Sequence, residues 1–150
     1  MKKKLLFIAF SLLAIVAKAQ NPGMSDLTID NEKSDLFTMK VLSCVGNTSS
    51  QTVLVTFAIE QSKTNQYVHM HEHVVLDEEG NQYEYEWPKD GRGGFDGVYA
   101  PTGQRRKCKT IITGILPRVK NISYLEYEVR METTKEKFKV ILKNLPIEWR

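Results

Sequence analysis

The 150-residue sequence lacks the short motifs on which common enzyme chemistries depend. It contains no glycine-framed serine, no His-Glu-x-x-His and no glycine loop in the strand-then-helix context of a nucleotide site. Histidine occurs three times and cysteine twice, and neither cysteine lies in a Cys-x-x-Cys pair or beside a histidine. These absences argue against hydrolytic, nucleotide-dependent and thiol chemistry. We therefore predict that the chain is not an enzyme.

Long hydrophobic runs are also scarce, and the single one lies at the N-terminus. Three lysines at positions 2–4 precede an apolar stretch over residues 5–16, which Ala17-Lys18-Ala19 follows. This arrangement predicts a signal peptide over residues 1–19 with cleavage near Ala19-Gln20, and the run is too short to span a bilayer. No cysteine lies near the cleavage point and no later run is apolar enough, so we expect neither a lipid anchor nor a transmembrane segment. The mature chain is expected to be exported, either periplasmic or extracellular.

Excess positive charge is missing from the mature chain. The whole sequence has 21 Lys and Arg against 18 Asp and Glu, but four of the lysines lie in the predicted signal peptide. Without them the net charge is −1. A chain with so little net charge gives no electrostatic reason to expect nucleic acid or an anionic membrane as a partner.

The two cysteines, Cys44 and Cys108, leave two alternatives open. Export would place the chain where disulfides persist, and a bridge would close a loop of about 65 residues, worth roughly 4 kcal/mol on chain-entropy grounds. The other alternative is a pair of separate buried thiols that act as small apolar side chains. The sequence does not choose between them, because a bridge requires Cα atoms within about 7 Å.

Helical periodicity is also missing, and the mature chain shows period-two alternation instead. A polar segment over residues 20–35 leads into the domain, with one short strand expected around Leu27–Ile29. Apolar and polar residues then alternate, as is typical of strands, over 36–45, 53–60, 66–76, 82–87, 104–115, 123–133 and 138–142. Turn-forming residues separate these ranges. The pattern predicts one all-β domain over residues 36–150, an antiparallel β-sandwich of about seven strands.

Four segments resemble, in their order along the chain, small exported bacterial immunoglobulin-like domains. They are QTVLVTFAIEQ, LDEEGNQYEY, TGILPRVKNISYLEYEV and FKVILKNLPIEW. The resemblance is to the telokin-like group, which includes secreted mycobacterial antigens. The chain differs from antibody domains, because Trp87 lies late between the cysteines and no Asp-x-Gly-x-Tyr-x-Cys corner is present. The resemblance brings no catalytic residues or cofactor, and it implies a binding or structural role.

All three histidines lie within five residues, as His69, His71 and His73. On a strand they share one face, with neighbours about 7 Å apart, from which two imidazoles can reach one ion. His69 and His73 are about 13 Å apart, so a zinc or copper site would use two histidines and a ligand from a neighbouring strand. The alternatives are the solvated face of an amphipathic strand and a pH-responsive interaction surface.

The third ligand depends on the register of a hairpin that the sequence predicts over residues 66–87. A two-residue turn would place Glu84 and Glu86 beside the histidines and direct the aromatic residues of the return strand into the core. A three-residue turn would place those aromatic residues beside the histidines instead. The first register buries more apolar surface, so Glu86 is the predicted metal ligand. In this first register the core positions of the hairpin would be Tyr83, Tyr85, Trp87, Val68, Met70, Val74 and Leu76.

Residues 88–103 hold five of the nine glycines and two of the five prolines, so they predict a long loop that is either functional or a mobile connection. Exposed aromatic and arginine side chains are favoured at recognition sites. Arg92, Phe95 and Tyr99 are therefore the candidate contact residues of this loop. The predicted function is binding of a protein or a glycan through loops at one end of the sandwich, and the alternative is zinc or copper binding by the histidine strand.

Overall fold

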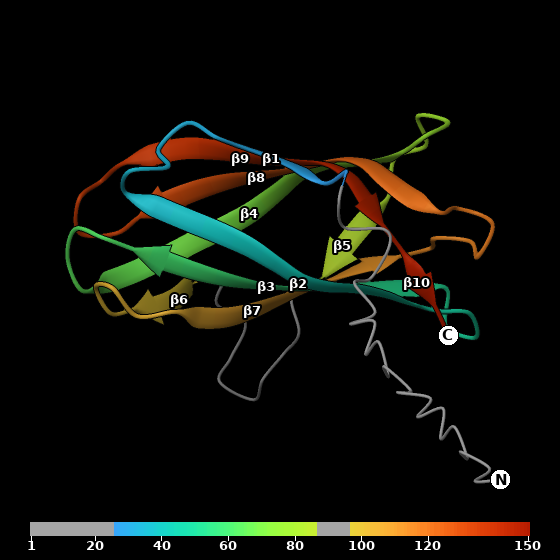
Figure 1. The fold of residues 1–150 in the computed structure, drawn as a ribbon, viewed down its shortest axis with the longest axis horizontal. Coiled ribbons are helices and arrows are strands. Elements are labelled where there is room, and N and C mark those ends of the chain that lie inside the picture. Colours follow the sequence, from blue (N-terminus) through green and yellow to red (C-terminus); the bar gives the residue numbers. More distant parts are fainter. Residues whose placement is uncertain (1–25, 87–96) are drawn as a thin grey trace, which may run out of the picture.

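The computed structural model describes residues 26–86 and 97–150, which form ten strands in two five-stranded sheets (Figure 1). The first sheet has the order β1-β9-β8-β4-β6 and the second the order β10-β2-β3-β7-β5. Every pairing is antiparallel except that of β10 with β2. The prediction of an all-β chain with antiparallel sheets is confirmed. The described residues include no helix able to cross a membrane.

The bounds of the strands agree with the predicted ranges where the alternation is long. The first sheet consists of β1 (Thr28–Asn31), β9 (Lys137–Pro146), β8 (Asn121–Met131), β4 (Gln66–Asp77) and β6 (Gly97–Ala100). The second consists of β10 (Glu148–Trp149), β2 (Phe37–Asn47), β3 (Thr52–Gln61), β7 (Arg106–Thr113) and β5 (Glu84–Glu86). Three further strands, β1, β6 and β10, have two to four residues each and lie at sheet edges. The first overlaps the short strand predicted around Leu27–Ile29, and the other two were not predicted. Such short strands leave little periodicity to detect.

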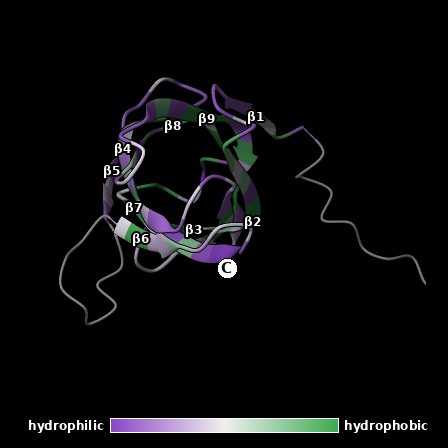
Figure 2. Cartoon of the chain, turned by 90° about the vertical axis from the view of Figure 1, so that its left-hand side faces the viewer, coloured by the Kyte–Doolittle hydropathy of each residue, from purple (hydrophilic) through white to green (hydrophobic). Residues whose placement is uncertain are grey.

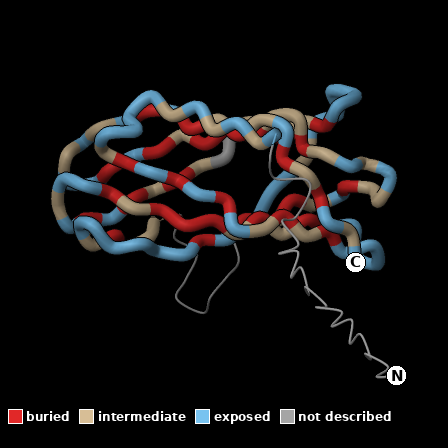
Figure 3. The backbone as a smooth tube through the Cα atoms, in the orientation of Figure 1, coloured by how far each residue is buried: buried red, intermediate tan, exposed pale blue. Residues whose placement is uncertain are grey.

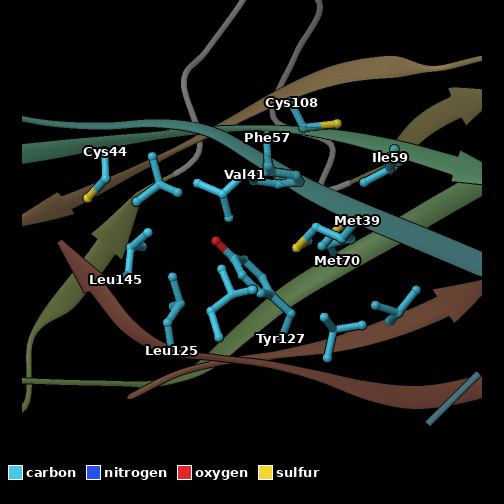
Figure 4. Close-up of a cluster of buried hydrophobic side chains, with 14 of the residues drawn as sticks. Met39, Val41, Cys44, Phe57, Ile59, Met70, Cys108, Leu125, Tyr127 and Leu145 are labelled. Carbon is cyan, nitrogen blue, oxygen red and sulfur yellow. The ribbon is translucent and has the colours of Figure 1, made fainter. Parts of the chain in front are cut away.

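The two sheets curve around a shared interior (Figure 2), which the central strands fill with alternate side chains. Buried and exposed positions alternate along these strands (Figure 3). The fully buried residues of β3 and β8 include Val53, Val55, Phe57, Leu125, Tyr127, Val129 and Met131. The rings of Phe57 and Tyr127 meet across the sheets with centroids 5.6 Å apart (Figure 4). Burial of each such side chain stabilises the fold by about 1.5–3 kcal/mol.

In two strands the set of residues that points into the core switches part of the way along. The sequence pattern does not reveal this switch. In β4 the register shifts between Glu72 and Val74, so the buried residues change from Val68 and Met70 to Val75. Val74 and Leu76, predicted in the core, are only half-buried. A β-bulge adds one residue to one strand of a pair, and this single residue inverts the faces of everything after it. A similar shift in β2, between Val41 and Ser43, directs Cys44 into the core.

The predicted hairpin register is wrong. After the turn that follows Asp77, strand β5 crosses to the second sheet, where Glu86 pairs with Ile111 of β7. Between β4 and this segment only an isolated bridge, Leu76 to Gln82, remains. Glu86 therefore belongs to a different sheet from the histidines. Tyr85 is 37% exposed instead of core-forming, and Trp87 lies outside the described residues.

The predicted loop over residues 88–103 contains an edge strand. Gly97 to Ala100 form β6 and pair with residues 66–69 of β4, so Tyr99 lies on a strand. Arg92 and Phe95 lie outside the described residues, as does the predicted signal peptide. The predictions made for these residues stay predictions.

The cysteines are separate thiols in this structure. Cys44 and Cys108 are free, and each is 5% exposed. They lie on β2 and β7, with β3 between these strands, and they lie well apart in the core (Figure 4). The bridged alternative does not describe this structure. Burial raises the pKa of both thiols to about 12, which suits small core side chains better than reactive ones.

Candidate functional site

The candidate site lies on the outer face of the first sheet, at the end where β4 begins. The outward residues of β4 there are Tyr67, His69 and His71, which the alternation with buried Val68 and Met70 directs away from the core. Strand β6 flanks β4 on one side and β8 on the other. His69 stands opposite Gly97 of β6 and Arg130 of β8. Three paired strands thus carry this part of the site.

A pair of tyrosines occupies the edge of this face. Tyr67 and Tyr99 are 49% and 44% exposed, more than any other large hydrophobic side chain among the described residues. They are partners in the β4–β6 ladder, and their rings meet edge to face with centroids 5.4 Å apart. Such an arrangement is the favoured geometry for two aromatic rings. The pair forms a preorganised aromatic surface on the sheet edge.

A cleft of about 390 Å³ lies next to the tyrosines. It is lined by His69, His71, Arg130, Met131, Glu132, Lys135 and Lys137, which come from β4, from β8, and from the turn and strand that follow β8. Arginine and lysine carry a full positive charge at neutral pH, so three cations face one carboxylate, that of Glu132. The cleft is therefore cationic although residues 20–150 together carry a net charge of only −1.

The absence of a side chain at Gly97 leaves room for the His69 ring. A Cβ atom at Gly97 would lie 2.8 Å from Cε1 of His69, so the imidazole lies against the bare backbone of β6. On its other side, Nε2 of His69 is 3.9 Å from a carboxylate oxygen of Glu132. A side chain at position 97 would displace this ring, because the tip of His69 is the part that can move.

The predicted metal ligands are only partly brought together. His69 and His71 share a face and line one cleft, as expected, whereas Glu86 lies in the other sheet. The side chain of His73 lies outside the described residues. Among the side chains that the structure describes, no three of His, Cys, Asp and Glu gather as a metal site requires. Two histidines thus remain as the candidate ligands for zinc or copper.

Two buried glutamines hold the turns around this site. The side-chain amide of Gln61 donates to the Ala100 carbonyl at 2.9 Å, and its oxygen accepts the N–H groups of Lys63 and Thr64. The oxygen of Gln66 accepts the N–H groups of Thr133 and Thr134 at 3.0 and 3.2 Å. Both glutamines are at most 2% exposed. They fix the end of β6 and the turn that carries Lys135.

Sequence reasoning missed most of the lining residues and both glutamines. The glutamines continue the inward phase of buried Ile59 in β3 and Val68 in β4, so their phase was a usable signal. Arg130 and Lys137 gave no such signal, because an alternating charged residue is typical of any solvent-facing strand.

In sequence comparisons no protein-family model and no curated protein matches the chain. The role of the surface is therefore inferred from its own chemistry.

Proposed function

We propose that this chain is an exported, non-catalytic module with an immunoglobulin-like β-sandwich of the telokin-like type, which binds a glycan or a protein. The observation that carries the proposal is the exposed pair of Tyr67 and Tyr99 beside the cationic cleft. Tyrosine and arginine are the residues that most often dominate recognition surfaces. Tyr99 also belongs to the segment for which the sequence predicts recognition.

The position of the tyrosines on strands supports a binding role. A ligand that orders flexible side chains loses affinity, at about 0.5–1.5 kcal/mol for each one that it immobilises. Tyr67 and Tyr99 already contact each other on paired strands, so less freedom remains to be lost. A predicted signal peptide and a near-neutral mature chain fit a module that meets its ligand outside the cytoplasm.

The proposal predicts that the tyrosine pair is required for binding. The double variant Tyr67→Ala/Tyr99→Ala is compared with Tyr85→Ala, because Tyr85 is similarly exposed but lies on the second sheet. Binding is measured on immobilised cellulose, chitin, alginate, heparin and peptidoglycan sacculi. We expect the double variant to bind at least about tenfold more weakly than wild type, since aromatic anchors typically contribute 2 kcal/mol or more, and Tyr85→Ala to stay within about twofold.

An equal loss in Tyr85→Ala would contradict the proposed surface, because the effect would then not depend on the β4–β6 edge. Binding of Zn²⁺ tighter than about 10 μM by the untagged protein, lost in His69→Ala/His71→Ala, would favour the metal-binding alternative.

A further inference from the structure

We infer that the ligand of this surface is a saccharide that carries carboxylate or sulfate groups. The inference rests on the proposed function, since it names the ligand class of the same tyrosine pair and cleft. The observation behind it is that an exposed aromatic surface adjoins a small cationic cleft, which begins at His69, the next outward residue of β4 after Tyr67.

The cations of the cleft are available to a ligand. Among the described residues, neither Lys135 nor Lys137 takes part in an ion pair, and both are exposed. Arg130 has one weak contact, at 3.7 Å to Glu128, which leaves most of its five N–H donors unused. Lys139, the next outward residue of β9, is different, because it is bound to Glu126 at 2.7 Å. The cleft thus presents two lysines that form no ion pair with the described residues and an arginine that is only weakly paired.

The tyrosines suit a sugar ring. A pyranose has an apolar face of C–H groups and a rim of hydroxyl groups, and a tyrosine offers an apolar ring with a polar tip. Residues two apart on a strand are about 7 Å apart, so Tyr67 and His69 are separated by about the width of one sugar. A ring placed on the tyrosines would therefore direct a substituent into the cleft.

The acceptors of the cleft favour a saccharide over other anions. Glu132 can accept hydrogen bonds from hydroxyl groups, and the imidazole ring of His69 adds a further hydrogen-bonding group. The phosphate groups of a nucleic acid offer no such donors. A protein partner would need about 800 Å² of complementary surface, whereas a cleft of about 390 Å³ matches the lower range of small-ligand sites, roughly 300–1,000 Å³.

The test compares two variants that remove the same charge from opposite sheets. Arg130→Gln/Lys137→Gln changes the cleft, and Lys107→Gln/Lys109→Gln changes exposed lysines of β7 in the second sheet. The probes are an alginate hexasaccharide, a heparin hexasaccharide and neutral cellohexaose, titrated by calorimetry at low salt. Wild type is expected to prefer at least one anionic probe over cellohexaose. We expect the cleft variant to bind that probe at least about tenfold more weakly and the β7 variant within about threefold.

Gly97→Ala provides an independent readout, because it removes no charge. It displaces the His69 ring, so we expect affinity for the anionic probe to fall at least about threefold while the melting temperature changes little. An equal loss of affinity in the β7 variant would overturn the inference, since binding would then follow net charge. A wild-type preference for cellohexaose that Tyr67→Ala/Tyr99→Ala abolishes would also overturn it while leaving the proposed function intact. Binding that is insensitive to both tyrosines would instead remove the proposed function.

Discussion

The two ends of the sandwich are held together by different chemistry. The site end comprises the turns at 62–65, 101–105 and 132–136, and the far end comprises the turns at 48–51, 78–83 and 114–120 together with β10 (Figure 1). At the site end the polar residues that are buried as a whole are Gln61 and Gln66, whose side chains are neutral amides, and Glu136 is only partly buried. At the far end they include a buried carboxylate, and a tryptophan secures the last strand.

The far end depends on charge and on one close contact. Asp77 is 3% exposed, and its carboxylate accepts hydrogen bonds from the backbone N–H groups of Glu79 and Asn81, the Asn81 amide and the Tyr83 hydroxyl, at 2.7–2.9 Å. The indole of Trp149 lies directly on Gly46, and its Nε1–H donates to the Val119 carbonyl at 2.7 Å.

If the proposed function holds, this difference separates the groups that stabilise the domain from those that bind its ligand. Neutral amides hold the site end without adding charge next to the cationic cleft, and their hydrogen bonds do not depend on pH. The far end carries no candidate site, so a carboxylate there can organise a turn without changing the electrostatics of ligand binding. The predictions below ask whether the two ends respond differently to mutation and to pH.

The largest effect is expected from Trp149→Ala, which removes the closing contact of the far end. It eliminates the indole hydrogen bond and the packing on Gly46. We expect the free energy of unfolding to fall by about 3 kcal/mol, in the range of large-to-small substitutions of aromatic side chains. Urea unfolding followed by fluorescence measures it.

A double-mutant cycle provides the control for this contact. A Cβ at position 46 would lie 2.3 Å from the indole, so Gly46→Ala should destabilise wild type by about 1–3 kcal/mol through overpacking. In the Trp149→Ala background the same change should be nearly neutral. Additive effects of the two substitutions would show that they do not act through one contact.

An intermediate effect is expected at the site end from Gln66→Met. The substitution keeps a similar volume but leaves the N–H groups of Thr133 and Thr134 without their acceptor. We expect a loss of about 2 kcal/mol in the free energy of unfolding, of equal size at pH 7 and pH 3. Because the same turn carries Lys135, affinity for the anionic probe should also fall. Gln104→Met, at an exposed glutamine of the same end, should change neither quantity.

The sequence was sufficient to predict the class of fold, but not to predict where the chain passes from one sheet to the other. Long alternating strands such as β3 and β8 are predictable because one face must be buried and their side chains repeat every second residue. The bulge in β4 is not, since one inserted residue leaves the composition unchanged and only the pairing with β8 defines it. Strand β5 crosses to the second sheet directly after the turn that Asp77 organises. A charged turn sequence does not distinguish this path from an ordinary hairpin.

The candidate site was predictable only in its local part. The shared face of His69 and His71 follows from their spacing in one strand. Arg130 and Lys137 reach the same cleft only through the pairing of β4 with β8 and of β8 with β9. Such long-range register is a property of the whole sheet, so no window of sequence contains it. Glu86 was misplaced for the same reason, because its partner in the sheet was wrongly predicted.

The smallest effect is expected from the charge of Asp77, and it appears only at low pH. Burial alone would raise the pKa of this carboxyl, but the hydrogen bonds from Asn81, Tyr83 and Glu79 outweigh burial and lower it from 3.8 to about 2. A folded-state pKa below the unfolded value stabilises the protein above about pH 4, and this stabilisation is lost as the pH falls toward 2. We expect the charge to contribute about 1–2 kcal/mol, after a reduction for solvent screening.

The measurement is the difference in free energy of unfolding between wild type and Asp77→Asn, taken from pH 6 to pH 2. Other carboxylates titrate in both proteins, so their effects cancel and the difference should shrink by about 1–2 kcal/mol over this range. Glu79→Gln keeps the backbone hydrogen bond from residue 79 to Asp77, so it is the control for loss of a carboxylate from the same turn. In Gln66→Met the corresponding difference from wild type should stay constant, because no charge is removed. A constant difference for Asp77→Asn as well would mean that both ends are held by hydrogen bonds whose strength does not depend on charge.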